Sequence, residues 1–154
     1  MDIKQIESFF FKAMVEGWAI GSKKIKIADM PGYKAIPFRN GDFYLLDCYC
    51  VTNNSPKSAG TTTIWFQDVP VWLMNYRGFY EESVIAFLKR ALHKTYEAHQ
   101  FIGGRGPILY EEDDLVYMNH PDHNDFADFD GDEEVFDADG TSFGYHKYWG
   151  MSLI

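Results

Sequence analysis

The segment VWLMNYRG, residues 71–78, places the tightest constraint on the fold. Side chains along a strand point alternately to opposite faces of a sheet. One face therefore carries Trp72, Met74 and Tyr76, and the residues between them lie on the other. Both faces are largely apolar, which is typical of a strand that is covered on both sides. We expect this strand to lie inside the molecule and to end at Gly78.

The chain has 154 residues, of which 46% are hydrophobic and 18% aromatic. This length and composition suit one packed core, so we predict a single domain over residues 1–154. The formal net charge of −9 opposes contact with nucleic-acid phosphates. We therefore expect no direct DNA or RNA partner.

The sequence also predicts a cytoplasmic protein with no membrane partner. No apolar run is as long as a membrane span, and MDIKQIESFFFKAM lacks the basic start and uninterrupted apolar run of a signal peptide. Cys48 and Cys50 lie two positions apart on a predicted strand, which is poor disulfide geometry, and two cysteines are too few for a zinc site. We expect both thiols to be reduced.

Hydrophobic periodicity predicts two helices, at residues 3–16 and about 81–98. Strands are predicted where aromatic and aliphatic residues gather, at residues 42–51, 61–66, 69–76, 115–118, 133–136 and 142–149. The short Gln67–Asp68 link predicts a hairpin, in which Pro70 would lie on an edge strand or at a strand start.

Two segments rich in glycine, proline or small polar residues are predicted to be irregular. Residues 21–42 read as a loop with at most a short strand near Ile25, and residues 53–60 read as a turn.

A helix followed by three strands is thus predicted twice, which suggests an internal repeat. An offset of 72 residues places Tyr76 on Tyr148 and Gly78 on Gly150 without a gap. We therefore predict an α+β fold made of two αβββ halves, with antiparallel sheets, two packed helices and a pseudo-two-fold axis. The halves would be residues 1–78 and 79–154, approximately.

The same alignment places Trp72 on Gly144, and Met74 on His146. The first half therefore has a large side chain, Trp72, at a position where the second half has none. Either Trp72 packs into the space beside Gly144, or that space is the wall of a pocket.

Several motifs, led by WLMNYRG, FLKRAL and GGRGP, resemble those of a bacterial domain family of unknown function. The matching positions here are Asp47 with Tyr49, residues 72–78, residues 87–92, residues 105–107 with Tyr110, residues 129–135, and Tyr148 with Gly150. The resemblance covers most of the chain from about residue 40, and it departs at AGTTTIWF and YWGMSLI. Because that family occurs alone or behind an Xre-type helix-turn-helix and has no assigned activity, the resemblance implies a fold and a surface without a reaction.

The GGRGP segment has two interpretations. Its glycines allow a loop of backbone amides around Arg105 that could bind an anion. Alternatively the glycines end the preceding helix, Pro107 blocks its continuation, and Arg105 pairs with a carboxylate of this acidic chain.

The acidic stretch from residue 120 to 140 fits no EF-hand register. Four residues of this stretch are of the types that bind transition metals: His120, Asp122, His123 and Asp125. We favour instead a solvated acidic loop anchored by Phe126 and Phe129, and we predict no metal site.

Catalytic patterns are scarce. The chain has no G-x-S-x-G motif, and Glu133 and Glu134 would face opposite sides of a strand, so they cannot form an adjacent acid/base pair. An enzyme is therefore less favoured than a binding protein, and no cofactor is predicted.

We expect a small-molecule-binding or sensing module with an aromatic pocket between the halves. The residues predicted to line this pocket are Trp72, Met74, Tyr76, His146 and Tyr148, with Arg105 orienting a polar or anionic group. Two alternatives stay open: an acidic inhibitor or immunity-like protein that masks a basic partner through residues 111–140, and a hydrolase that uses Arg105 with a His or Asp. An exposed strand ending at Gly78 or Ile154 could also pair across a homodimer.

Overall fold

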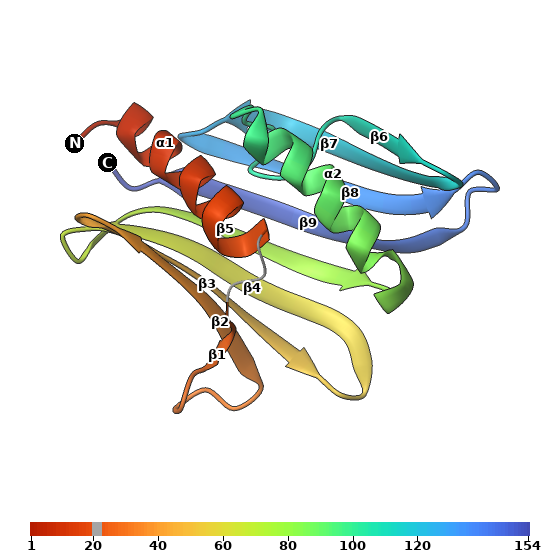
Figure 1. Cartoon of the computed structure of the whole chain (residues 1–154), viewed down its shortest axis with the longest axis horizontal. Helices are drawn as coiled ribbons and strands as arrows, with labels where there is room; N and C mark the ends of the chain where they lie inside the picture. Colours follow the sequence, from red (N-terminus) through yellow and green to blue (C-terminus); the bar gives the residue numbers. More distant parts are fainter. Residues whose placement is uncertain (20–22) are drawn as a thin grey trace.

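The computed structural model describes residues 1–19 and 23–154, which form two main helices on a nine-stranded antiparallel sheet (Figure 1). The predicted α+β class with two packed helices is confirmed. In chain order the elements are α1 Ile3–Ala13, η1 Met14–Ala19, β1 Ile25–Lys26, β2 Tyr33–Asn40, β3 Phe43–Thr52, β4 Ser55–Phe66, β5 Val69–Tyr80, η2 Glu82–Val84, α2 Ile85–Glu97, β6 Leu109–Glu112, β7 Leu115–Asp125, β8 Asp128–Asp137 and β9 Ser142–Ser152.

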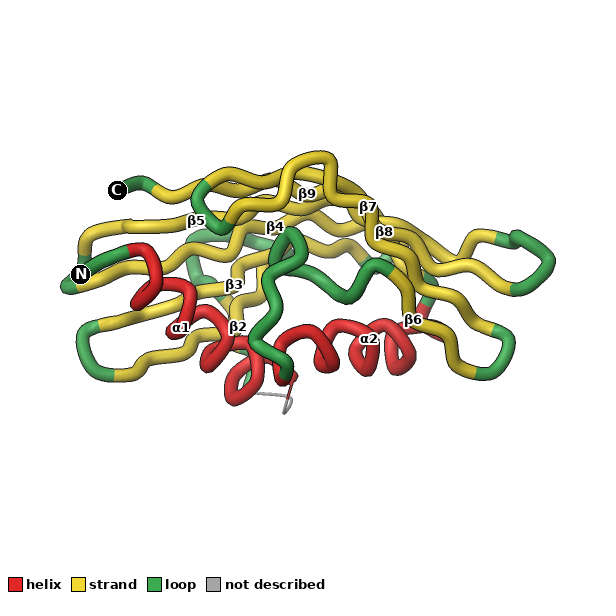
Figure 2. The backbone as a smooth tube through the Cα atoms, turned by 90° about the horizontal axis from the view of Figure 1, so that it is seen from above, coloured by secondary structure: helices red, strands yellow, loops and turns green. Residues whose placement is uncertain are grey.

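The strands follow the order β1-β2-β3-β4-β5-β9-β8-β7-β6, so β5 and β9 meet at the centre of the sheet. Both helices lie on one face of it (Figure 2). Neither helix in the described part of the chain is long and apolar enough to cross a membrane. Since β5 and β9 pair with each other, the strands that end near Gly78 and Ile154 are not edges, and the edges are β1 and β6.

The two halves of the sheet match in strand spacing. Phe43 and Leu115, which begin β3 and β7, are 72 positions apart, as are Tyr80 and Ser152, which end β5 and β9. Tyr76 pairs with Tyr148 in the β5–β9 ladder. The helices do not share this spacing, because α1 begins at residue 3 and α2 at residue 85. An origin by duplication therefore stays a prediction.

The β5 strand differs from expectation in two ways. It continues through Gly78 to Tyr80, and its second face is only partly covered, since Val71 is buried but Leu73 is half-exposed. Pro70 lies at the start of the strand, which is one of the two expected positions, although β5 is central rather than an edge. Gly78 has a φ of +154°, and a Cβ there would lie 1.9 Å from the carbonyl oxygen of Tyr145. The glycine is needed for close packing of β5 on β9, and it does not end the strand.

Three predicted irregular segments form strands instead. The strand β2 occupies the second part of the expected loop at residues 21–42, β4 begins inside the expected turn, and the acidic stretch is the long β7–β8 hairpin rather than a loop. The expected short strand near Ile25 is confirmed as β1. Pairing in a sheet depends on neighbouring strands more than on local propensity, so polar sequences such as SPKSAG adopt a ladder when a partner strand is present. The short β6 was not anticipated.

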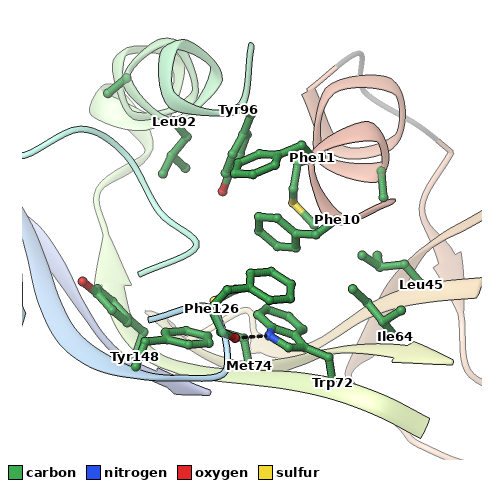
Figure 3. Packing of buried hydrophobic residues seen from close by; sticks show 14 of the residues in the cluster. Phe10, Phe11, Leu45, Ile64, Trp72, Met74, Leu92, Tyr96, Phe126 and Tyr148 are labelled. Carbon is green, nitrogen blue, oxygen red and sulfur yellow. Dashed lines mark hydrogen bonds between the residues drawn. The ribbon is translucent and has the colours of Figure 1, made fainter. Parts of the chain in front are cut away.

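The core lies between the helices and the sheet and is dominated by aromatic rings (Figure 3). Trp72 is fully buried, stacks with Phe126 and Phe129, and donates its indole N–H to the carbonyl oxygen of Phe126 at 2.9 Å. Phe10 of α1 packs against the same indole. Trp72 therefore packs as a core residue, and Phe126 and Phe129 anchor the acidic hairpin as expected.

Candidate functional site

A cavity of about 280 Å³ lies between α2, the start of η1, and strands β2 to β5 and β9. We call it the central cavity. Its walls are apolar and aromatic and include Ile36, Met74, Tyr80 and Leu88. Its polar residues include Asp47, Ser58, Thr62, Arg105 and His146. A concave, largely apolar space with a few convergent polar groups is typical of a small-molecule site.

Asp47 is a buried carboxylate that faces the central cavity from β3. The hydroxyls of Thr62 and Tyr76 donate to its Oδ1 at 2.9 and 2.8 Å. Burial raises the pKa of Asp47, against the lowering effect of these two hydrogen bonds. Both bonds reach the same oxygen, so within the described residues Oδ2 has no hydrogen-bond partner.

Arg105 lies in the loop after α2 and forms a buried ion pair with Glu133 of β8. Glu133 also accepts a 2.5 Å hydrogen bond from the Tyr117 hydroxyl. Burial alone would raise the pKa of Glu133, but the charge of Arg105 and hydrogen bonds from Arg105 and His146 lower it to about 2. The Arg105 guanidinium also lies 5.8 Å from the centre of the Tyr76 ring. Arg105 thus pairs with a carboxylate, as the second interpretation of GGRGP expects, but α2 ends at Glu97, so the glycines do not end this helix. Anion binding by the loop stays a prediction.

His146 of β9 connects this ion pair to the central cavity. Its Nδ1 lies 3.6 Å from Glu133 Oε1 and 3.4 Å from an Arg105 nitrogen, and its Nε2 lies 3.5 Å from Ser58 Oγ. Burial lowers the pKa of His146, which favours a neutral ring at neutral pH. A Cβ at Gly78 would lie 2.8 Å from His146 Cδ2, so the glycine leaves room for the ring to lean toward β4.

Ser58, His146 and Glu133 stand in the order of a serine–histidine–acid relay. Glu133, however, already accepts hydrogen bonds from Arg105 and Tyr117. Such a relay needs a histidine that is oriented and stabilised by its own carboxylate. The arrangement therefore suits binding better than nucleophilic catalysis, and the hydrolase alternative stays a prediction.

Four of the six predicted site residues line the central cavity: Met74, Tyr76, Arg105 and His146. Trp72 belongs to the core cluster, and Tyr148 packs against Gly103 and Gly131 away from the central cavity. Asp47 is a cavity residue that was not predicted as a ligand contact. Its signal is an acid within the apolar run FYLLDCYCV, where a buried charge needs a polar partner.

The second half repeats the Asp47–Tyr76 pair with a different acceptor. Asn119 lies 72 positions after Asp47, and the hydroxyl of Tyr148 donates to its Oδ1 at 2.6 Å. The amide of Asn119 donates to the carbonyl oxygens of Ile102 and Gly106, at 3.1 and 2.8 Å. In the second half, the loop of residues 102–106 therefore packs against Asn119 and pairs with its amide. In the first half, the corresponding residue, Asp47, faces the central cavity instead.

A wider hollow of about 890 Å³ lies across Thr61, Asn75 and Trp149, on the face of the sheet away from the helices. Acidic and basic side chains share its lining, including Asp130 and Lys147. This surface is more polar and less enclosed than the central cavity.

The residues weighed as metal ligands do not form a cluster. Among the described residues, no three His, Cys, Asp or Glu side chains gather as a candidate metal site. His123 instead lies 3.6 Å from Asp128 across the turn of the β7–β8 hairpin.

Comparison with known proteins places the chain in a family. No curated protein and no solved structure matches it. A family model described as a domain of unknown function, DUF5680, matches residues 47–152, a range that begins at Asp47 and includes Tyr76, Arg105 and His146. The expected likeness to an uncharacterised domain is thus confirmed, and the chain belongs to the DUF5680 family.

Proposed function

We propose that the protein is a small-molecule-binding or sensing module and that its ligand occupies the central cavity. The observation that carries this proposal is Asp47, a buried residue whose Oδ2 makes no hydrogen bond within the described residues and which lines the central cavity. A carboxylate oxygen in a largely apolar cavity is poorly solvated and gains from a hydrogen-bond donor. A ligand that supplies that donor would be stabilised in the cavity.

The buried charges beside the central cavity support the same proposal. Arg105 and Glu133 form an ion pair that is almost fully buried. Hydrophobic residues of similar volume often stabilise a fold as well as such a pair does. Stability alone therefore does not account for placing an ion pair here, and recognition of a ligand in the adjacent cavity would.

Thermal-shift screening against metabolites tests the proposal, with two serine variants of β4 as a matched pair. Ser58 lines the central cavity, whereas Ser55 is similarly half-buried on the same strand outside it. We expect a ligand at a hundred times its Kd to raise the Tm of the wild type and of Ser55→Leu by about 5–10 °C. Ser58→Leu should lose this response. Equal responses in both variants, or no response in any protein, would contradict the proposal.

One observation favours a second candidate, an acidic interaction protein. Asp122, Asp125, Asp128 and Asp130 are all exposed around the end of the β7–β8 hairpin. Such a surface attracts a basic partner, and the association should weaken as salt concentration rises. Retention of binding partners at low salt by the wild type, compared with a variant carrying Asn at all four positions, tests this candidate.

A further inference from the structure

The two tyrosine pairs provide an internal guide to the ligand. Tyr148 holds Asn119, whose amide is bound by peptide carbonyls of the loop at residues 102–106. Tyr76 holds Asp47 through the matching bond, but the carboxylate faces the central cavity. Residues 30–34, which lie 72 positions before that loop, make no side-chain hydrogen bond to Asp47.

The hydrogen-bonding groups around Asp47 restrict the chemistry of the ligand. An ionised Asp47 only accepts, so its Oδ2 calls for an N–H or O–H donor. Arg105 and His146, which line the same cavity, carry N–H groups that can donate to a ligand acceptor. A ligand group with a donor beside an acceptor could therefore bind Asp47 through the donor, and Arg105 and His146 through the acceptor.

Charge narrows the choice further. A cationic ligand would meet Arg105, Lys24 and Lys89, all of which line the central cavity. A carboxylate would face Asp47. An uncharged amide or lactam avoids both repulsions and presents N–H beside C=O.

The volume of the central cavity and its aromatic walls indicate the size and shape of the rest of the ligand. A cavity of about 150 Å³ can hold benzene, so 280 Å³ leaves room for one ring with a polar substituent. The rings of Tyr76 and Tyr80 offer flat apolar surfaces beside His146. Aromatic contacts of this kind favour a planar ligand.

We infer that the central cavity takes an uncharged amide or lactam attached to a body about the size of one ring. Its N–H binds Asp47 Oδ2, and its carbonyl oxygen faces Arg105 and His146. This inference rests on the proposed function and specifies the ligand class for the same site.

Four probes with the same ring separate the possible chemistries: benzamide, methyl benzoate, benzoate and benzylamine. Their affinities are measured by titration into the ¹⁵N-labelled full chain, and the shifted backbone signals locate each site. We expect benzamide to bind about tenfold more tightly than methyl benzoate, which lacks the donor. The two charged probes should bind more weakly than benzamide.

Asp47→Asn makes the first half resemble the second. The Asn Oδ1 can still accept from Thr62 and Tyr76, so the fold should persist, while its NH₂ now faces the central cavity and donates. The preference for benzamide over methyl benzoate should fall below about threefold. Asp68→Asn, at the exposed turn between β4 and β5, is the control and should keep the wild-type ranking.

The outcomes separate the inference from the proposed function. If methyl benzoate, benzoate or benzylamine binds in the central cavity as tightly as benzamide, the amide inference is wrong and cavity binding stands. An unchanged ranking in Asp47→Asn would overturn the inference in the same way. If no probe shifts signals of the central cavity at millimolar concentrations, or if shifts occur only around Thr61 and Trp149, both proposals fail.

Discussion

The Asp47–Tyr76 pair and the Asn119–Tyr148 pair are built alike and end differently. In each, a tyrosine of a central strand donates to an acceptor 29 positions earlier in the chain. Asn119 is closed over by the backbone of residues 102–106, whereas Asp47 opens on the central cavity. In the second half, the side chain of Asn119 is paired within the protein. In the first half, the carboxylate of Asp47 is available to a ligand.

The largest expected effect on stability is at Glu133, which lies between the two pairs and accepts hydrogen bonds from Arg105 and Tyr117. Glu133→Ala leaves the buried Arg105 without its carboxylate, so we expect a loss of about 3–5 kcal/mol in unfolding free energy. Urea denaturation measures it. Glu134→Ala, at the half-exposed neighbouring position, should cost less than about 1 kcal/mol. Similar losses in both variants would mean that Arg105 does not depend on Glu133.

Exchanging the two acceptors tests the comparison itself. Asn119→Asp turns a carboxylate toward the carbonyl oxygens of Ile102 and Gly106, and we expect a loss of about 3 kcal/mol. Asp47→Asn keeps its two acceptor bonds and should change stability by less than about 1 kcal/mol. Chemical denaturation of both variants gives the two values. Equal losses of unfolding free energy in the two variants would mean that Asp47 and Asn119 have equivalent surroundings, which would contradict the comparison.

Acid should weaken the protein through Glu133. Its pKa is near 2 in the folded state, below the ordinary value of about 4.3. The folded state therefore holds the charged form more strongly, and the stabilisation is present above about pH 4.5 and lost as the pH falls toward 2. The loss is about 3 kcal/mol.

The contribution of Asp47 to stability depends on pH in the opposite direction. Because burial raises the pKa of Asp47, its contribution is favourable at low pH and is lost as the pH rises through the folded-state pKa. Denaturation midpoints between pH 2 and 7 should show a flatter acid limb in Glu133→Gln and a steeper one in Asp47→Asn. An unchanged pH profile in Glu133→Gln would contradict the assignment to this residue.

The smallest effects are expected at the tyrosines. Tyr148→Phe removes a bond to the fully paired Asn119, and Tyr76→Phe removes one from Asp47, so each should cost about 1 kcal/mol. With an amide ligand present, Tyr76→Phe should also lower its affinity, since Asp47 then loses a hydroxyl that holds its carboxylate in place, while Tyr148→Phe should leave it unchanged. Titrations of the two variants compare these responses. Equal affinity losses would indicate an indirect effect.

The sequence carried enough information for the framework of the fold. Apolar spacing marks both helices, and the 72-residue offset anticipates how β3 and β7, and β5 and β9, correspond. The Gln67–Asp68 hairpin is also confirmed, with φ of 48° and 64° at the two turn residues. These features are local or periodic, so they can be read without knowing the neighbours of each strand.

The missed elements depend on those neighbours. Strand β2 is stabilised by its full ladder with β3, and the acidic strands β7 and β8 pair along most of their length. No local pattern distinguishes such strands from polar loops. The site has the same limitation: Trp72 and Met74 share a face in the sequence, but only the placement of Phe126 decides that Trp72 belongs to the core.

The central β5–β9 ladder has a consequence for dividing the chain. A fragment that stops at Tyr80 would leave the backbone amides and carbonyls of β5 along a bare margin, from Trp72 onward. Such a margin readily recruits another strand. We expect a shortened chain of this kind to associate with its own copies, because the seam between the halves is continuous main-chain bonding and not a hinge.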